Sequence, residues 1–360
     1  MEIFVLNTNF ESVAVVDEFE SLIWTDRYDD AGDFELFMSM DKRLLEYLKQ
    51  NYYLWNAESE HMMIIEQINI TSDVEEGNKL IVTGRSLESI LDRRIIWGQK
   101  VLSGGLQDAI HTLIDECIIS PTISDRKIDN FIFVENLNPK ITALTIDTQY
   151  TGDNLFDVVK TLCEKNNIGF KIILNESNQF EFSLYSGEDR SYEQTENPYV
   201  IFSPDFENII NSNYLESSKT MKNVTLVAGE GEGANRKTTT VGDAYGLNRR
   251  ELFTDARDIS SDIGDGETLT DAEYYEQLNQ RGTDGLAEYP SITSFEGEVE
   301  ATRMFKYGID FFIGDIVQIT NEYGHEGRAY ISEFVMSQSE SGLSMYPTFK
   351  TIQEGEDDTL

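Results

Sequence analysis

The sequence predicts a β-rich α+β fold in which two β-rich blocks flank an α+β block. Short apolar runs separated by turn-forming residues recur towards both ends of the chain and are typical of strands. Two stretches in the middle instead repeat apolar residues at helical spacing. The chain has 360 residues, of which 40% are hydrophobic, so it can bury sizeable cores in roughly two to four domains.

Residues 1–99 are predicted to form a small, strongly bent sheet or barrel with little helix. Strands are expected at Ile3–Leu6, Val13–Val16, Leu22–Tyr28, Ala31–Leu36, Met62–Thr71 and Lys79–Arg85. Turn-forming residues at Asp29–Gly32 and Asp73–Asn78 predict two hairpins among these strands. Short helices are expected over Asp41–Tyr47 and after Ser86, whose hydroxyl suits an N-cap.

Residues 100–190 are predicted to form the α+β domain. Apolar residues share one helical face from Leu106 to Ile118, and again from Leu155 to Cys163. Asn166, Asn167 and Gly169 then end the second helix, because Asn and Gly tolerate the left-handed conformation found there. The segment after them predicts a hairpin, with strands at Phe170–Leu174 and Gln179–Tyr185.

Residues 191–248 and 296–351 together form the second predicted β domain. Its strands are expected at Tyr199–Phe202, Asn223–Ala228, Glu298–Ala301, Ile313–Ile319 and Arg328–Phe334. The glycine-rich segment 229–237 predicts a loop or hairpin tip. Residues 249–295 are an acidic insert, in which Thr270–Glu273 matches a capping box at the start of a helix. Residues 352–360 are an acidic tail that we expect to be disordered.

The net charge of −38 is the strongest signal in the composition. It makes binding of nucleic acid by counterion release unfavourable, because such a field repels phosphate. Two interpretations remain: a solvated surface that keeps the protein soluble, or an acidic wall past which nucleic acid moves without binding. No apolar run approaches the roughly 20 residues that span a bilayer, and the first residues do not form a signal peptide. We therefore expect that the chain does not insert into a membrane and that it is made in a cytoplasm.

No catalytic, cofactor-binding or metal-binding residue can be assigned from the sequence. His61, His111 and His325 share no ligand spacing. Cys117 and Cys163 lie on apolar helical faces, which favours core packing over catalysis. The acidic stretch 255–271 fails the EF-hand pattern, although an irregular calcium site there stays open. The segment after Gly229 lacks the third glycine and the helix of a dinucleotide-binding turn. The three tryptophans, Trp24, Trp55 and Trp97, lie in or beside apolar segments and are expected to be core residues.

An ordered set of motifs resembles the tail-tip hub proteins of siphophages in the Gp37-like group. In chain order the motifs are Trp24–Tyr28, Ala31–Leu36, Gly84–Ile95, Asn223–Val224, Arg249–Glu251, Arg281–Gly282, Leu286–Glu288 and Gly314–Val317. No single motif is decisive, but their order and spacing hold from about Ile3 to Phe349.

The resemblance implies a structural protein without enzymatic activity. Members of this group resemble baseplate hubs, in which three copies form a ring and two hub-type β-barrel domains per chain imitate a six-fold tail tube. The implied partners are two further copies, the distal tail protein, the tape-measure protein and receptor-binding or fibre proteins. DNA would pass through the bore without specific binding. The implied location is the tip of the virion tail, after assembly in the bacterial host cytoplasm.

Two other classes remain as alternatives. A cell-wall hydrolase such as a peptidoglycan endopeptidase would need a metal site or nucleophile that the sequence does not display. A receptor- or carbohydrate-binding module would need exposed aromatic clusters, and aromatic residues make up 11% of the chain. Many relatives of such hubs continue into a peptidase or lysozyme-like domain. The sequence ends at Leu360 after the second β block, so we expect any such activity to reside in another protein.

Overall fold

The computed structural model describes residues 1–73, 77–264, 267–299, 304–324 and 326–351, which are β-rich with few helices, as predicted. The chain separates into two compact units, each built from discontinuous segments. Unit 1 comprises Met1–Ser89, Gly169–Tyr214 and the described residues from Ser294 onwards. Unit 2 comprises Ile90–Ile168 and Leu215–Thr293.

Unit 1 is organised around one large mixed sheet of 13 strands. Its main path runs β14-β20-β23-β22-β3-β4-β7-β6-β5-β1-β2, and β21 and β13 extend it from β22. The strands are β1 (Ile3–Leu6), β2 (Ser12–Val16), β3 (Ser21–Arg27), β4 (Asp33–Ser39), β5 (Tyr53–Trp55), β6 (Met63–Asp73), β7 (Gly77–Ser86), β13 (Ile201–Phe202), β14 (Ile209–Ser217), β20 (Ile292–Val299), β21 (Ile316–Thr320), β22 (Glu326–Ser339) and β23 (Gly342–Thr351). The unit also holds the hairpin β11 (Gly169–Leu174) and β12 (Phe180–Tyr185), the helix α1 (Lys42–Leu45) and the 3-10 turn η4 (Pro204–Phe206).

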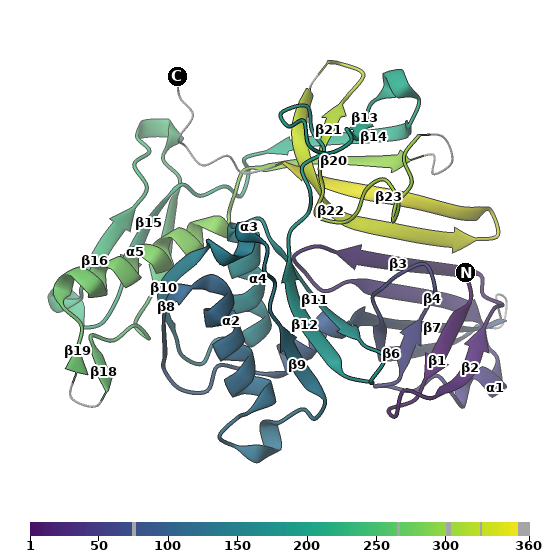
Figure 1. Cartoon of the computed structure of the whole chain (residues 1–360), viewed down its shortest axis with the longest axis horizontal. Helices are drawn as coiled ribbons and strands as arrows, with labels where there is room; N and C mark the ends of the chain where they lie inside the picture. The colour runs from purple at the N-terminus through teal and green to yellow at the C-terminus, as the bar shows by residue number, and fades with distance from the viewer. Residues whose placement is uncertain (74–76, 265–266, 300–303, 325, 352–360) are drawn as a thin grey trace. The chain divides into compact units, whose positions relative to one another are not determined.

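The two ends of the chain meet in this sheet. Strand β22 pairs antiparallel with β3, in a register that places Phe334 opposite Asp26 and Ser339 opposite Ser21. Figure 1 shows the pair where the purple and yellow strands lie side by side. On the other side of β22 lies β23, its partner in a second antiparallel pair. The N-terminal and C-terminal β blocks therefore form one continuous sheet.

A single apolar core supports both halves of the sheet. Fully buried side chains come from the N-terminal strands, such as Trp24 and Leu36, and from the C-terminal strands, such as Phe334 and Phe349. Each buried side chain of this size contributes roughly 2–3 kcal/mol through removal of apolar surface from water. The shared core gives the two β blocks a common source of stability.

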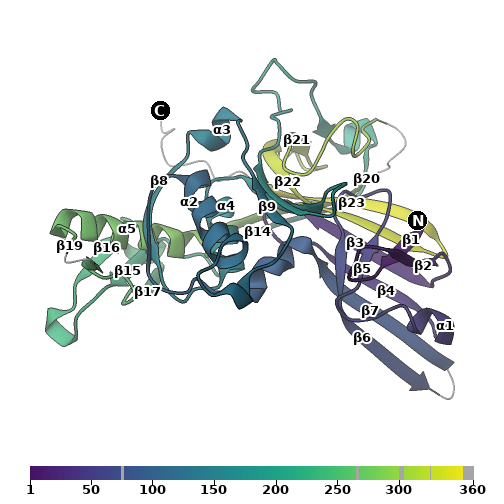
Figure 2. The ribbon, with the colours of Figure 1, turned by 60° about the horizontal axis from the view of Figure 1, so that its bottom comes forward.

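The local predictions for the N-terminal block are confirmed with small shifts. Strands β3 and β4 form the predicted hairpin, as do β6 and β7, which Figure 2 shows as a long pair. Asp41 caps α1 by accepting a hydrogen bond from the backbone N–H of Arg43. The helix expected after Ser86 is the 3-10 helix η1 (Leu87–Arg93). The Ser86 hydroxyl accepts a hydrogen bond from the distant backbone N–H of Gly32 at 2.7 Å.

Unit 2 contains the longest helices of the described residues. Its elements are β8 (Lys100–Gly105), α2 (Leu106–Ile114), the π-turn η2 (Asp115–Ile119), the 3-10 turn η3 (Ser124–Arg126), β9 (Phe131–Val134), α3 (Pro139–Thr142), β10 (Thr145–Tyr150), α4 (Leu155–Lys165), β15 (Val224–Ala228), η5 (Gly233–Asn235), β16 (Thr238–Val241), η6 (Gly246–Asn248), β17 (Glu251–Asp255), β18 (Asp262–Gly264), β19 (Glu267–Thr268) and α5 (Asp271–Ala287). The predicted capping box is present, because Thr270 and Glu273 bond each other's backbone N–H groups at the start of α5. Segment 229–237 connects β15 to β16, as predicted for a hairpin tip.

The division into units differs from the predicted domain boundaries at several places. Residues 90–99 lie in unit 2, and the β11–β12 hairpin, predicted within residues 100–190, lies in unit 1. Residues 215–248 were predicted to belong with the second β domain, yet they lie in unit 2. The reason is packing: Val227 on β15 shares a small core with Tyr274 and Leu278 of α5. The three-stranded sheet β16-β15-β17 therefore needs the helix of the acidic insert to cover one face.

Helix α5 lies close to this sheet because Gly282 has no side chain. A Cβ atom there would come within 2.6 Å of the Val227 Cγ2 atom and 2.7 Å of the Val241 Cγ2 atom. We expect Gly282→Ala to lower the free energy of unfolding by about 1–3 kcal/mol, although alanine favours helices. Urea unfolding would measure this. The control is Gly285→Ala in the same helix, where the nearest atom is the Thr254 hydroxyl oxygen at 2.9 Å. Equal stabilities of the two variants would contradict the close packing.

In the described part of the chain, no helix is both long enough and apolar enough to cross a membrane.

Candidate functional site

A buried charged cluster lies in unit 1, where four segments distant in sequence converge. Asp26, near the end of β3, is 1% exposed. Its carboxylate accepts hydrogen bonds from the Ser59 hydroxyl at 2.8 and 2.9 Å and from the indole N–H of Trp24 at 3.1 Å. The Ser59 oxygen in turn accepts the backbone N–H of His61 at 3.0 Å. The side chain of Asp26 thus anchors the segment that precedes β6.

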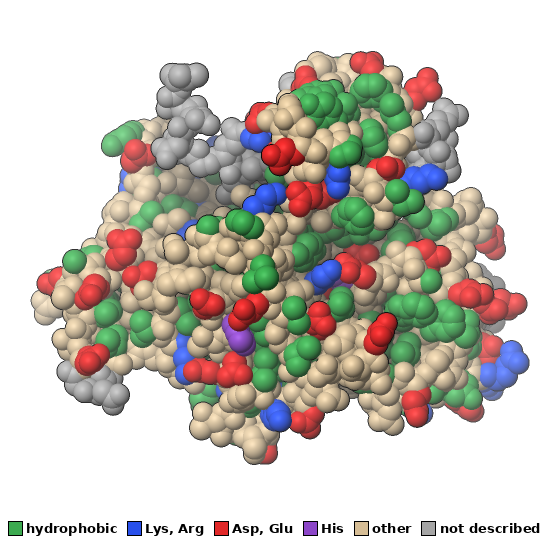
Figure 3. Space-filling view, in the orientation of Figure 1, with side chains coloured by type: hydrophobic (Ala, Val, Ile, Leu, Met, Phe, Trp, Pro, Cys, Tyr) green, Lys and Arg blue, Asp and Glu red, His purple; other side chains and the backbone are tan. Residues whose placement is uncertain are grey.

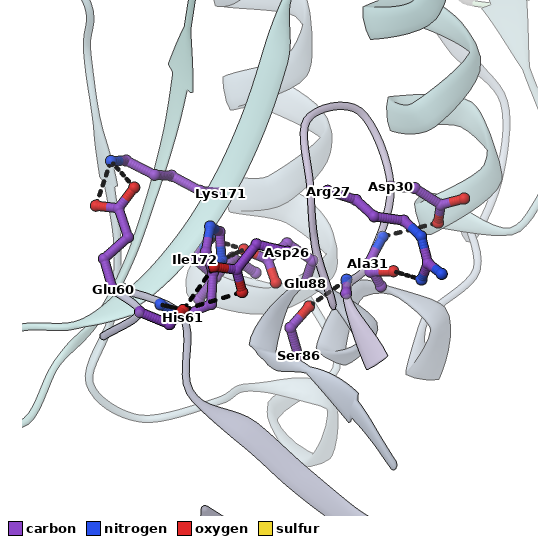
Figure 4. Close-up of polar contacts among 12 residues, drawn as sticks. Asp26, Arg27, Asp30, Ala31, Glu60, His61, Ser86, Glu88, Lys171 and Ile172 are labelled. Carbon is purple, nitrogen blue, oxygen red and sulfur yellow. Dashed lines mark hydrogen bonds and ion pairs between the residues drawn. The ribbon is translucent and has the colours of Figure 1, made fainter. Parts of the chain in front are cut away.

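His61 and Glu88 form the ionic centre of the cluster (Figure 4). The His61 Nδ1 atom lies 3.1 Å from the Glu88 Oε1 atom, and both side chains are at most 5% exposed. The same Glu88 oxygen accepts the backbone N–H of Ile172 in β11 at 2.8 Å. At the rim, Lys171 donates to both oxygens of Glu60 at 3.0 and 2.8 Å. The cluster therefore fixes the β11–β12 hairpin to the first β block.

Opposing electrostatic effects set the charge states in the cluster. Burial alone would lower the pKa of His61, but the negative charges of Glu88 and Asp26 outweigh it and raise that pKa to about 9. Burial alone would raise the pKa of Glu88, yet the His61 charge and the hydrogen bonds lower it. The pKa of Asp26 is raised, chiefly by burial. At neutral pH the centre is an imidazolium–carboxylate pair.

The geometry of the cluster fits a structural tie better than a catalytic site. The Ser59 hydroxyl donates to Asp26, while the His61 ring bonds to Glu88, so these residues do not form a relay from serine to histidine to carboxylate. Burial also keeps His61 and Glu88 away from any substrate in bulk solvent. A buried pair that lost one partner would leave an uncompensated charge, which makes the cluster important for folding.

Tyr28, directly after β3, forms a second point in unit 1 where distant segments are held together. We call such points, including the His61–Glu88 cluster, joints. Tyr28 is 2% exposed, and its ring packs edge-on against Tyr185, with the ring centroids 5.1 Å apart. Its backbone binds two other segments: its N–H donates to the carbonyl oxygen of Ser332 at 2.9 Å, and its carbonyl accepts the N–H of Phe170 at 3.1 Å. Glycine is needed at Gly314, because a Cβ atom there would lie 2.3 Å from the Tyr28 ring.

Asp315 completes this joint through a buried ion pair with Arg190. The Asp315 side chain is 3% exposed, and its Oδ2 atom accepts a hydrogen bond from the Arg190 Nε atom at 2.7 Å. It also accepts the backbone N–H groups of Glu188 and Phe312, at 2.7 and 3.0 Å. These bonds offset the cost of burying the charge. They hold the chain after β12 against the start of β21.

Unit 2 contains two comparable joints, one at Arg281 and one at Asn223. The Arg281 guanidinium binds Asp258 at 2.9 and 3.2 Å and lies over the Tyr150 ring, 5.3 Å from its centroid. It thereby ties α5 to β10. The Asn223 side chain accepts the N–H of Arg250 at 2.8 Å and donates to the carbonyl of Asn248 at 2.8 Å. It thus holds the starts of β15 and β17 together.

Of the two histidines that the structure describes, His61 pairs with a carboxylate, that of Glu88. His111 stacks on Phe133, with the ring centroids 4.4 Å apart. His325 lies outside the described residues. Cys117 and Cys163 are both buried and unbonded to one another, which confirms core packing. The described residues contain no group of three or more His, Cys, Asp or Glu arranged to hold a metal ion. Asp265 and Gly266 of the open calcium segment lie outside the described residues.

The prediction that all three tryptophans are core residues is wrong for two of them. Trp24 is fully buried, but Trp55 is 37% exposed and Trp97 is 62% exposed. In β5 the alternation along the strand turns Leu54 inwards and Trp55 outwards, where it packs on Phe4 with ring centroids 5.2 Å apart. Trp97 lies between η1 and β8, and its ring is covered by the Arg126 guanidinium at 5.2 Å.

Comparison with known protein families shows which family the chain belongs to. The family model described as Siphovirus ReqiPepy6 Gp37-like protein matches residues 2–349. The chain belongs to this family. No curated protein matches the chain. The resemblance inferred from the motifs is therefore confirmed.

Solved structures of tail proteins share the fold of this Gp37-like chain. Prophage tail protein gp18 from Listeria monocytogenes has a TM-score of 0.56 and 11% identity, over 99% of this chain and 96% of that one. The tail protein from Neisseria meningitidis has a TM-score of 0.57 and 13% identity, over 97% and 95%. The 43 kDa tail protein of prophage MuSo2 from Shewanella oneidensis has the same score and identity, over 97% and 98%. These values show a shared fold along the whole chain.

The motifs that carried the resemblance lie at the joints just described. Trp24, Asp26 and Tyr28 belong to the first motif and Glu88 to the strand-to-helix motif. Gly314 and Asp315 come from the last motif, and Asn223 and Arg281 from those in unit 2. Sequence reasoning assigned no site residues and missed this convergence. The available signal was a charged residue within an apolar segment, as at Asp26 and Glu88.

Proposed function

We propose that this Gp37-like chain is the structural hub of a phage or prophage tail tip. In this role three copies close the end of the tail tube as a ring. The ring joins the distal tail protein to receptor-binding or fibre proteins, contacts the tape-measure protein and lets DNA pass during ejection. The chain is assembled in the host cytoplasm and resides at the tip of the virion tail.

The observation that carries the proposal is a fold shared over nearly the whole length with tail proteins. The alignments cover 95–98% of the Neisseria and Shewanella chains, so the likeness does not depend on one common domain. The joints in both units support the same proposal of a structural role. Their polar side chains bind other parts of the chain, as expected for a scaffold.

Within this proposal, the two halves of the large sheet act as the two tube-like β domains. The sheet offers a natural division at the β22–β3 pair, with β4, β7, β6, β5, β1 and β2 on one side and β23, β20 and β14 on the other. Three copies would present six such halves, which suits a junction with a six-fold tube. The shared core at the division would keep the two halves in fixed register.

The acidic composition supports passage of DNA without binding. Carboxylate side chains are spread across the face shown in Figure 3, between scattered basic ones. With 66 acidic and 28 basic residues, a bore lined by average surface would be negative. A negative wall repels the phosphates of the DNA, so the DNA does not bind to the wall as it passes.

Electron microscopy of the purified chain tests the proposal directly. We expect particles with three-fold symmetry, an open bore and a negative potential along its wall. In the phage itself, deletion of the gene should give tails without a tip and no infectious particles. Normal tails in the deletion strain would overturn the proposal. A neutral or basic bore would overturn only the account of DNA passage.

A receptor-binding module is the second candidate, because Trp55 and Trp97 are exposed against expectation. Its discriminating measurement is binding of the fluorescently labelled chain to host cells. Loss of binding in a Trp55→Ala variant would favour this role. The hydrolase alternative is tested by clearing of cell-wall suspensions, and activity of the chain alone would favour it.

A further inference from the structure

The arginines of this acidic chain divide into two groups. Those with a carboxylate partner within 4.0 Å are Arg27, Arg43, Arg85, Arg190, Arg236, Arg249, Arg257, Arg281 and Arg328. Among the described residues, Arg93, Arg94, Arg126 and Arg250 form no such ion pair, and the side chains of the last three donate to oxygen atoms of the chain instead. Three of these four lie together in unit 2. In a chain with 66 acidic residues, such a gathering of unpaired arginines calls for an explanation.

The three arginines line the same depression as Trp97, and two of them, Arg94 and Arg126, bond to backbone carbonyls. Arg94 donates to the carbonyl oxygen of Arg126 at 2.9 and 3.1 Å, and Arg126 donates to that of Ile95 at 2.6 Å. These bonds orient the guanidinium groups without neutralising them. Burial and then the charges of Arg126 and Arg93 lower the pKa of Arg94, which shows that the positive charges repel one another.

The surrounding surface is apolar and hollowed. We call Arg93, Arg94, Ile95, Trp97, Ile123 and Arg126 the Trp97 patch. Its apolar members are well exposed: Trp97 is 62% exposed, Ile95 46% and Ile123 43%. A depression of about 320 Å³ runs along the patch, and Asp92 and Asp125 also line it. Asp92 is bonded to the Asn154 amide and Asp125 to the Ser124 hydroxyl.

This composition is that of an energetic centre in a protein interface. Tryptophan and arginine are the residues most enriched among those that dominate binding energy. Arginine is also suited to bidentate recognition of carboxylates. Exposed aromatic and branched apolar side chains gain from burial, at about 25 cal/mol per Å² of apolar surface. The occupant should therefore be a protein surface that carries carboxylates.

We propose that the Trp97 patch binds an acidic surface of a second copy of this chain. The net charge of −38 makes copies repel one another over most of their surface, so a self-contact needs a place of opposite charge. A second copy also supplies unpaired carboxylates in excess. A contact between the patch and a different surface of the neighbour is heterologous, which is the type that closes rings. The inference rests on the proposed trimeric hub and names one contact within it.

Sedimentation velocity over a range of concentrations and salt tests this contact. We expect the wild-type chain to self-associate and to dissociate as sodium chloride rises, because salt screens the charge pairs. Arg93→Glu/Arg94→Glu/Arg126→Glu should weaken self-association by about 100-fold or more, and Trp97→Ala by about 10-fold. The matched control is Lys42→Glu/Arg43→Glu/Lys49→Glu, which changes the net charge equally at exposed positions of unit 1. It should weaken self-association much less. Circular dichroism would verify that every variant is folded.

Each of the following outcomes would contradict the proposed contact. Equal loss in the control variant would mean that only net charge matters. Unchanged self-association of the patch variants would place the contact elsewhere and leave the hub intact, as three-fold particles would then show. A wild-type chain that stays monomeric at all concentrations would exclude the self-contact, and the deletion strain would still decide the role of the hub. Binding of a 20-nucleotide DNA probe, lost on charge reversal and without self-association, would assign the patch to nucleic acid instead.

Discussion

Replacing His61 with glutamine is expected to lower the free energy of unfolding at pH 7 by about 2–4 kcal/mol. The substitution keeps a hydrogen-bond donor of similar size but removes the positive charge that compensates buried Glu88 and Asp26. Chemical denaturation of both proteins would measure the difference. A loss below about 0.5 kcal/mol would mean that the cluster is hydrated or that the pair is neutral.

The same pair predicts a loss of stability in alkali. His61 has a pKa of about 9 in the folded protein, above its ordinary value of 6.5. Its contribution is therefore complete below pH 6.5 and is lost as the pH rises through 9, by an amount on the order of 3 kcal/mol. The stability difference between wild type and His61→Gln should shrink over this window. Asp26→Asn leaves the His61–Glu88 pair in place but removes one of the charges that raise the His61 pKa, so it should retain a smaller alkaline loss. A constant difference from pH 6 to pH 10 would contradict the assigned charge state.

Replacing Gly314 with alanine is expected to cost about 3 kcal/mol or more. Two effects add at this position: φ is +88°, a conformation that L side chains rarely adopt, and the new Cβ atom would lie 2.3 Å from the Tyr28 ring. The ring has little room to move, because it lies close against Gly169, where even a Cβ atom would come within 2.5 Å of it, and because Tyr185 packs on it. Thermal and urea unfolding would measure the loss.

Gly308 provides a matched control for the contact with Tyr28. Its φ is +79°, but a Cβ atom there would meet nothing within 4 Å. Gly308→Ala therefore carries the backbone strain alone, and we expect a loss of about 1 kcal/mol. The difference between the two variants reports on the packing around Tyr28. Similar losses for both would mean that the joint adapts to a larger residue.

Much of the local structure could be predicted from short-range patterns. The β6–β7 hairpin follows from alternation on either side of a turn, and α5 follows from the capping box at Thr270 and Glu273. Helix α4 ends where expected, with Asn167 at a φ of +50°. These features depend on residues within a few positions of one another, so the sequence pattern is sufficient to define them.

The exposure of single side chains was harder to predict. Trp97 and Trp55 are large and apolar, and their apolar neighbours favoured burial. Trp55 is turned outwards by strand alternation, and Trp97 is covered by Arg126 from a segment almost 30 residues away in the chain. Such partners cannot be identified from residue type, because any of 14 arginines could serve.

The sequence by itself determined the β-rich class, most hairpins and helices, the acidic character and, through ordered motifs, the family. The tertiary structure alone decided that β22 joins the two β blocks into one sheet, and that β15 to β17 belong with α5. It also decided that Asp26, His61, Glu88 and Ile172 meet in one buried cluster. The physical reason is the same in each case. Pairing across a sheet and burial of charge depend on which distant segments become neighbours, and that choice is made by the collective packing of the core.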